Sequence, residues 1–298
     1  MPNNNNVSNL FALVDDDDAP VRRIPLTAEL NTELAQLFAE QQTSLLSDTR
    51  PIAFTGSYNV DEGEIFTIAH YPLPPAIGMA IGNPLTCPVL NLNTETHRIR
   101  ALFSGTWTVA KKAVNFQVFD AGKLLKRGFT LIGSGDIYKK LEEPGLMLQD
   151  KLTAHFHNGT LYFCSYHNTK RFLDLTEYYR EATDNDLDDF AAIELFIFED
   201  RAGFKGQADS IIRKKIALLQ KNEVLKDLTV ADIQAVANNF NADLSEEHHI
   251  NIMINEGGKL VIPEDKKQLK ELIRFLDEDY FTAPLTKRKC LTNSKQYL

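Results

Sequence analysis

The chain has 298 residues, of which 43% are hydrophobic and 24% are charged, and its formal net charge at pH 7 is −9. This length allows a sizeable core in one large or two ordinary domains, and we expect two. The acidic balance excludes a uniformly basic nucleic-acid-binding coat, but it leaves room for a local basic patch.

The N-terminal residues 1–20 combine an asparagine run with four consecutive aspartates, Asp15–Asp18, a composition typical of a disordered tail. This stretch lacks the basic start of a signal peptide, and no apolar run in the chain approaches the roughly 20 residues that span a bilayer. We therefore expect a cytoplasmic protein. No C-x-x-C spacing joins the cysteines, which indicates reduced thiols: Cys87, Cys164 and Cys290.

Residues 21–120 have the pattern of an N-terminal α/β domain. Apolar residues at helical spacing after Thr27 predict a helix, and Ile52–Phe54 and Ile65–Ala69 read as strands. The segment Tyr71–Pro88 contains five prolines and two glycines, so we expect a long connection without regular structure there.

A hairpin is predicted around Asn158-Gly159, because both residues of this pair tolerate the positive φ angles of a type I′ turn. The resulting register pairs Ala154 with Phe163 and directs five apolar side chains to one face, the predicted core: Leu152, Ala154, Phe156, Leu161 and Phe163. The opposite face carries Thr153, His155, Tyr162 and Cys164, and we expect Cys164 to belong to a core. Asn168 is the predicted N-cap of a helix that continues to Ala182.

The remaining sequence predicts more helices. Asp209 is a candidate N-cap, Thr229 and Asp232 form a candidate capping box, and Pro263–Asp265 precedes a third helical pattern. Two apolar runs on either side of Glu256-Gly257-Gly258 suggest a second hairpin. The predicted fold class is α/β (α+β), with two mixed sheet-and-helix parts; the C-terminal part, residues 121–298, is built on a β-hairpin followed by helices.

Charge is distributed unevenly along the chain. Residues 97–140 contain nine basic and two acidic residues, a balance of +7, whereas residues 172–200 contain one basic and ten acidic residues, a balance of −9. The last nineteen residues contain four basic residues and no acid. Opposite patches in one chain favour a homodimer or higher homo-oligomer, and the basic segments with nearby aromatic residues suit contact with a nucleic-acid backbone.

Other candidate chemistry is weaker. His155, His157 and Cys164 lie close enough in the predicted hairpin to suggest zinc, but no fourth ligand has a recognisable spacing. Glu264-x-Lys266 is similar to half of a metal-dependent nuclease site, with Asp243, Glu246 or Glu247 as a second carboxylate, yet acids there also suit the first turn of a helix. Gly133-Ser134-Gly135-Asp136 lacks the third glycine of a dinucleotide-binding loop and predicts a plain turn. We expect no catalytic residue, metal or cofactor.

Several short motifs, taken in order, carry a family resemblance over roughly 180 residues. They are Asn115-Phe116-Gln117, Leu124-Leu125, Phe129-Thr130-Leu131, Leu141–Leu148, Leu161-Tyr162-Phe163, Phe172–Tyr179 and the closing segment Leu272–Leu298. In their order and spacing they resemble the KwaB-like family, the soluble component of the Kiwa antiphage defence system. The resemblance implies a cytoplasmic protein that binds DNA, works beside a small membrane protein, KwaA, and blocks phage propagation. It implies no catalytic residue.

These observations predict an antiphage effector that binds DNA in the cytoplasm and acts with a KwaA-like membrane partner, which recruits it to the inner membrane. A metal-dependent DNA nuclease using Glu264 and Lys266 and a non-catalytic scaffold are the alternatives. The residues predicted to contact DNA phosphates are the basic ones of the two segments: Lys287, Arg288, Lys289, Lys295, Arg98, Arg100, Lys111, Lys112, Lys123, Lys126 and Arg127.

Overall fold

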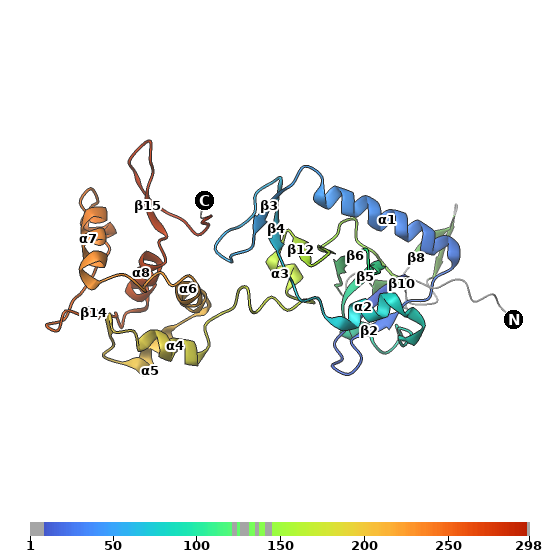
Figure 1. Ribbon diagram of the computed structural model, residues 1–298, viewed down its shortest axis with the longest axis horizontal. Helices are drawn as coiled ribbons and strands as arrows, with labels where there is room; N and C mark the ends of the chain where they lie inside the picture. Colours follow the sequence, from blue (N-terminus) through green and yellow to red (C-terminus); the bar gives the residue numbers. More distant parts are fainter. Residues whose placement is uncertain (1–8, 121–123, 126–130, 135–136, 141–144, 297–298) are drawn as a thin grey trace. The chain divides into compact units, whose positions relative to one another are not determined.

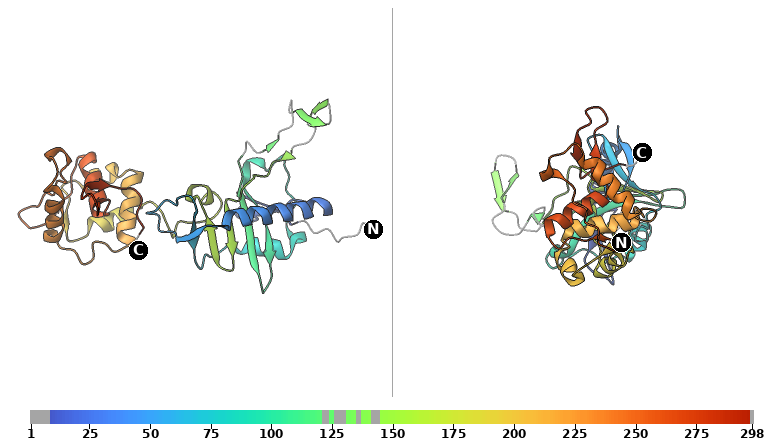
Figure 2. Two further views of the ribbon diagram at one scale, coloured as in Figure 1. Left: turned by 90° about the horizontal axis from the view of Figure 1, so that it is seen from above. Right: turned by 90° about the vertical axis from the view of Figure 1, so that its left-hand side faces the viewer.

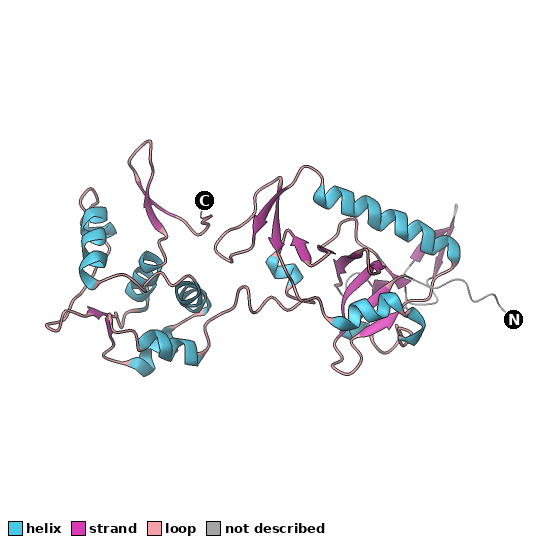
Figure 3. Cartoon of the chain, viewed as in Figure 1, coloured by secondary structure: helices cyan, strands magenta, loops and turns pink. Residues whose placement is uncertain are grey.

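The structure, a computed structural model, describes residues 9–120, 124–125, 131–134, 137–140 and 145–296. It divides into two compact units, Met1–Phe54 with Val60–Asp174, and Thr55–Asn59 with Leu175–Leu298 (Figure 1). The boundary expected near residue 120 lies inside the first unit and does not coincide with this division. The predicted α+β class is confirmed: the first unit contains a mixed sheet, and the second contains mainly helices (Figure 3).

An eight-stranded sheet of order β2-β1-β5-β6-β11-β12-β4-β3 forms the centre of the first unit. All neighbouring strands are antiparallel except the edge pair β3 and β4, which is parallel. The strands are β1 (Phe11–Val14), β2 (Val21–Arg23), β3 (Arg50–Ala53), β4 (Glu64–Ile68), β5 (Ile99–Trp107), β6 (Lys112–Val118), β11 (Ala154–His157) and β12 (Thr160–Phe163).

The predicted hairpin is confirmed as β11 and β12, in the expected register and with its core face buried. Ala154 pairs with Phe163, and the turn residues Asn158 and Gly159 have φ angles of 44° and 92°. This hairpin is an inner part of the sheet, because β6 pairs with β11 on one side and β4 with β12 on the other. On the face opposite the core face, His155 is also buried, with only 1% of its surface exposed.

Helix α1 (Ala28–Leu46) covers this second face of the sheet (Figure 2). The helix begins directly after Thr27, as the sequence predicted, and the Thr27 hydroxyl caps it by accepting from the backbone N–H of Leu30. Leu34 and Phe38 pack with apolar side chains from β1 and β5. Between helix and sheet, Gln117 donates from Nε2 to Gln41 Oε1 at 2.7 Å, so a polar pair is satisfied inside the layer.

The N-terminal residues 9–20 are ordered, in contrast to the expected tail. Residues Phe11–Val14 form β1, which lies between β2 and β5 and whose residues are all buried. The asparagine and aspartate runs on either side dominate the composition of the segment and conceal this four-residue apolar strand. Residues 1–8 lie outside the described ranges.

The proline-rich segment contains a helix, α2 (Pro75–Gly82), so the expectation of a long irregular connection was wrong. Pro75 occupies the first helical position, where the missing N–H of proline costs no hydrogen bond. Gly78 packs against Trp107, and a Cβ atom at this position would lie 2.4 Å from the indole ring. The helix therefore depends on a close contact that local sequence rules do not consider.

The helix predicted from Asn168 to Ala182 does not form. Only α3 (Tyr166–Thr169) is helical, with Ser165 rather than Asn168 as its N-cap. The division between the two units falls within this segment, after Asp174. Phe172 packs against Phe116 of the first unit, whereas Ala182 belongs to the core of the second. The apolar residues of the segment thus serve two cores, and one continuous amphipathic helix does not satisfy both.

The second unit packs its helices around a main hydrophobic cluster, with a smaller one beside α7. Asp209, Thr229 with Asp232, and Asp265 cap three of them, as predicted. The helices are α4 (Asp184–Ala191), α5 (Arg201–Gln207), α6 (Ser210–Lys221), α7 (Val230–Asn241) and α8 (Lys266–Leu276). The expected second hairpin is reduced to an isolated bridge between Ile254 and Leu260, because β14 (Leu260–Val261) pairs in parallel with β13 (Phe196–Ile197).

The remaining elements are short. β7 (Leu124–Leu125) pairs with β10 (Gly145–Leu146), β8 (Leu131–Ser134) pairs with β9 (Ile137–Lys140), and β15 (Tyr280–Thr282) pairs with β16 (Lys289–Leu291). The 3-10 helices are η1 (Pro84–Thr86), η2 (Thr96–Arg98) and η4 (Glu246–His248). Leu131 of the expected Phe129–Leu131 strand begins β8, and Phe129 lies outside the described residues, as do Gly135 and Asp136 of the expected turn.

Candidate nucleic-acid interface

The acid-free end of the chain folds into a hairpin that the sequence analysis did not predict. Strands β15 and β16 form an isolated two-stranded sheet, and the loop between them contains Lys287 and Arg288. The backbone N–H of Ala283 donates to the Arg288 carbonyl at 2.8 Å, and that of Lys287 donates to the Ala283 carbonyl at 2.9 Å. Both Lys287 and Arg288 are exposed, and neither forms an ion pair with any residue that the structure describes.

Lys289, the next cation, is the first residue of β16 and pairs with Thr282 where the hairpin meets its loop. Its side chain is only 12% exposed, and its ammonium lies 5.0 Å from the centroid of the Phe240 ring. It also donates to the Thr282 hydroxyl at 3.2 Å and lies 3.9 Å from the Asp243 carboxylate. Lys289 therefore joins β16 to β15 and to α7, and much of its charge is already used within the protein.

Lys295 is part of a buried ion cluster. Its ammonium lies 2.9 Å from Asp277 and 3.2 Å from Asp279, whose side chains are 2% and 0% exposed. Lys215 contacts the same two carboxylates at 2.8 and 2.7 Å, and Arg274 lies 3.0 Å from Asp279. The backbone N–H of Lys295 donates to the Ser57 carbonyl at 2.7 Å. Lys295 thus fixes the C-terminal segment within the second unit and presents little charge to solvent.

The two candidate arginines of the first unit are paired with the N-terminal aspartates. Arg98 lies 3.1 Å from Asp16 and donates from Nε to the Asp15 carbonyl at 2.8 Å, and Arg100 forms an ion pair with the Asp15 carboxylate. Asp16 also pairs with the buried Arg22 at 2.8 Å. The hydrogen bond from Arg22 is the main cause that lowers the pKa of the Asp16 carboxyl. The acidic run therefore neutralises part of the basic segment.

Two lysines of the first unit are exposed at the turn between β5 and β6. Lys111 and Lys112 lie beside the tip of this hairpin, and the Lys112 ammonium is 5.3 Å from the centroid of the Trp107 ring. In the described residues neither lysine has an acidic partner. Lys123, Lys126 and Arg127 are outside the described part of the chain. Exposed candidate cations thus occur in both units.

Part of the acidic segment is also paired within its own unit. Asp184 contacts Arg213 at 2.7 Å, Asp188 contacts Lys205 at 2.7 Å, and Asp186 forms a bidentate pair with Arg180. The Arg180 guanidinium holds the pKa of the Asp186 carboxyl far below its usual range. Arg213 and Lys205 belong to helices that follow this segment, so the charge balance of −9 for residues 172–200 did not include them.

The polar side chains of the β11–β12 hairpin separate into a buried and an exposed group. His155 is buried and its Nδ1 lies 2.6 Å from Asn115 Oδ1. Burial, together with the nearby charges of His157 and Lys111, lowers the pKa of His155 to about 4, so the ring is neutral at pH 7. Cys164 is exposed, and the expectation that it belongs to a core was wrong. Within the described ranges, no three His, Cys, Asp or Glu side chains are grouped as metal ligands.

Of the two residues of the nuclease alternative, Lys266 forms an ion pair within the second unit. Lys266 lies 3.2 Å from Asp209, the N-cap of α6. Asp265 caps α8 by accepting from the Gln268 N–H at 2.9 Å. Glu264 is exposed and precedes this cap. Asp265 therefore supports a helix start, in line with the competing interpretation of this stretch.

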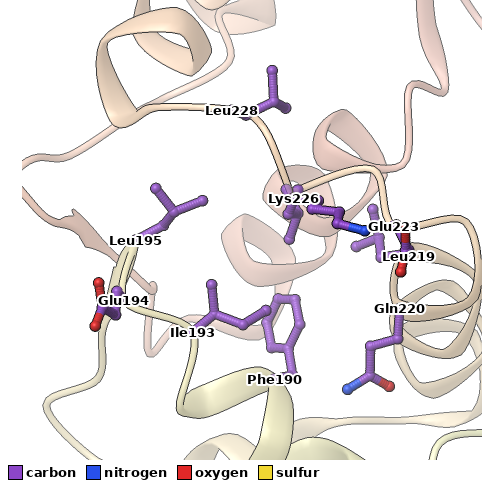
Figure 4. A pocket seen from close by; sticks show the side chains of 10 residues that line it. Phe190, Ile193, Glu194, Leu195, Leu219, Gln220, Glu223, Lys226 and Leu228 are labelled. Carbon is purple, nitrogen blue, oxygen red and sulfur yellow. Dashed lines mark hydrogen bonds and ion pairs between the residues drawn. The ribbon is translucent and has the colours of Figure 1, made fainter.

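The second unit also has a cavity of about 480 Å³ between the ends of α4 and α6 and the loop that follows α6 (Figure 4). Phe190, Ile193 and Leu195 form an apolar wall, and the ion pair of Glu223 and Lys226, 2.8 Å apart, lies at its edge. Phe190 also belongs to the hydrophobic core of the unit. The cavity is an open part of this core, and none of the candidate cations lines it.

Comparison with known proteins identifies one family. A family model described as "Kiwa protein KwaB-like" matches residues 111–286, which is more than half of the chain. The match covers β6, the β11–β12 hairpin, the helices of the second unit and the loop that begins after β15. Comparisons with curated proteins and with solved structures give no match.

Proposed function

Because the chain belongs to the KwaB-like family of Kiwa antiphage defence proteins, we propose that it acts in this defence by binding DNA. The proposed action is a non-catalytic one: the protein occupies phage DNA and, together with a KwaA-like membrane partner, blocks phage propagation. A binding function of this kind requires exposed cations for the phosphates and needs no metal or nucleophile.

One observation carries the proposal. Lys287 and Arg288 project from a hairpin loop, are exposed, and have no acidic partner among the described residues. Unpaired cations of this kind can neutralise phosphates without first breaking an ion pair in the protein. By the same criterion, Lys111 and Lys112 are the best candidates of the first unit, whereas Arg98 and Arg100 already pair with Asp15 and Asp16.

The salt dependence of binding tests this assignment. Each phosphate that a cation neutralises contributes about −0.9 to the slope of log affinity against log salt for duplex DNA. We expect the double substitution Lys287→Ala/Arg288→Ala to flatten this slope by up to about two units, measured by fluorescence anisotropy on unrelated duplex sequences. The matched control is Arg201→Ala/Lys259→Ala, which removes one exposed arginine and one exposed lysine of the same unit. Equal flattening in both variants would show that the hairpin loop has no special role.

The membrane connection is proposed to depend on a partner. No helix in the described ranges is long and apolar enough to cross a membrane. We propose a cytoplasmic protein that a KwaA-like protein recruits to the inner membrane. Cell fractionation with and without the co-expressed membrane protein tests this. Equal membrane association in both conditions would contradict the proposal.

A homodimer or higher oligomer is also proposed, although part of the charge that suggested it is paired within the chain. Asp184, Asp186 and Asp188 contact basic side chains of their own unit. Self-association would therefore depend on the remaining exposed charges. Sedimentation at low salt is the measurement, and a single monomeric species at micromolar concentration would remove the proposal.

A further inference from the structure

Two hairpin tips in this protein share an unusual arrangement of side chains. Val109, between β5 and β6, is 105% exposed, and Leu285, between β15 and β16, is 94% exposed. Among the described residues these are the two most exposed large hydrophobic side chains. Each is followed, two and three residues later, by a pair of cations: Lys111-Lys112 in the first unit and Lys287-Arg288 in the second.

The tip of the second-unit hairpin is held in shape from below. Lys289 lies over Phe240, and Tyr280 packs against Phe240 and Phe275 with ring centroids 5.7 and 6.3 Å apart. Above this base, Lys287 has a φ angle of 58°, a left-handed conformation that turns the chain back toward β16. Pro284 restricts the backbone immediately before Leu285. The leucine is therefore presented on a defined loop.

An exposed leucine beside two cations indicates a partner on which an apolar site and anionic groups lie close together. Burying one leucine side chain strengthens an association by about tenfold to a hundredfold. The exposed Leu285 therefore favours a binding partner whose surface covers it. A lipid bilayer fits less well, since even a whole myristoyl chain gives only marginal binding and one leucine is much smaller. Duplex DNA fits better, because its minor groove accepts a single apolar wedge between base pairs with phosphates on both sides.

We propose that the Pro284-Leu285 tip inserts between base pairs from the minor groove, while Lys287 and Arg288 contact the flanking phosphates. This inference rests on the proposed DNA binding and specifies its mode. Insertion unstacks one base step and bends the duplex by ~20–90°. Steps that unstack easily, such as TA, are preferred, so the protein distinguishes deformable from stiff DNA without hydrogen bonds to bases.

The experiment separates insertion from phosphate contact. Duplexes of about 30 base pairs with a central TA step or a stiff A-tract, labelled at both ends, report affinity by anisotropy and bending by energy transfer. We expect Leu285→Ala to bind the TA duplex about tenfold more weakly, to lose the bend and to keep the salt slope. Leu291→Ala, on the same hairpin and 48% exposed, is the matched control and is expected to bind and bend as the unaltered protein does.

The outcomes distinguish this inference from the proposed function. Duplex binding by the unaltered protein without any bend, or with the same bend in Leu285→Ala, overturns the insertion and leaves DNA binding in place. Absence of duplex binding at low salt overturns both. Vesicles of anionic phospholipid provide the last comparison: if Leu285→Ala loses vesicle binding while its DNA affinity is unchanged, the tip contacts lipid and the insertion is overturned.

Discussion

The hairpin loop and the C-terminal segment that follows it lie close in sequence, yet their cations have opposite environments. Lys287 and Arg288 are exposed on the loop, whereas the side chain of Lys295 is 11% exposed and contacts two buried carboxylates. Neither segment contains an acid of its own. The comparison shows that an acid-free stretch does not by itself indicate an exposed cation, because the partners of Lys295 come from the end of α8 and the residues after it.

The largest effect that this comparison predicts is the loss of stability on removing the Lys295 charge. Replacing one member of a buried ion cluster leaves a carboxylate partly uncompensated, and such changes cost about 3–5 kcal/mol. We expect Lys295→Met to lower the free energy of unfolding of the second unit by about 3 kcal/mol, because Lys215 and Arg274 still contact Asp279. Urea denaturation followed by far-UV circular dichroism measures it. A change as small as that of Lys287→Met would contradict the comparison.

In the first unit, the buried neutral His155 makes the free energy of unfolding depend on pH. The pKa of His155 falls from 6.5 to about 4 on folding, so the unfolded chain binds more protons than the folded one between these values. Stability is therefore complete above pH 6.5 and decreases as the pH falls toward 4. We expect a loss of about 2 kcal/mol by pH 5, from 1.36 kcal/mol per pH unit.

The fluorescence of Trp107, the single tryptophan, reports unfolding of the first unit in this experiment. His155→Gln removes the titrating group and is expected to flatten the dependence on pH. If the unaltered protein and His155→Gln lose stability in parallel as the pH falls, the buried histidine is not the cause.

Lys289 should show an intermediate effect, since it is neither fully exposed nor part of the buried cluster. Its contact with the Phe240 ring and its hydrogen bond to Thr282 are both lost in Lys289→Met, while the apolar stem is retained. We expect a decrease of about 1 kcal/mol in the stability of the second unit. Denaturation measures this decrease, and Lys259→Met serves as an exposed control.

The smallest effect on stability is expected for the loop itself. Exposed substitutions without partners usually change the free energy of unfolding by less than ~0.5 kcal/mol. Lys287→Ala/Arg288→Ala should therefore unfold as the unaltered protein does, even though it flattens the salt slope of DNA binding. A stability loss comparable to that of Lys295→Met would show that the loop is structural.

The sequence by itself determined those elements whose signals are local. The start of α1 after Thr27, the capping box of Thr229 and Asp232, and the Asn158-Gly159 turn each depend on a few residues, and each appears as predicted. The turn also set the register of the hairpin, because a shift by one residue would have exchanged its core and opposite faces. The family resemblance had the same origin, in short motifs and their order.

Only the tertiary structure decided what covers each surface and which charges meet. The strand Phe11–Val14, helix α2 beside Trp107 and the divided segment around Asp174 depend on contacts between residues far apart in sequence. The ion pairs of the acidic segment and of Lys295 have the same origin. A charge count over a sequence window measures proximity along the chain, whereas the exposure and pairing of a charge depend on proximity in space. Burial also strengthens the interaction between two charges that lie close in space. For this reason the sequence located basic segments, and the fold separated Lys287 and Arg288 from the cations that hold the protein together.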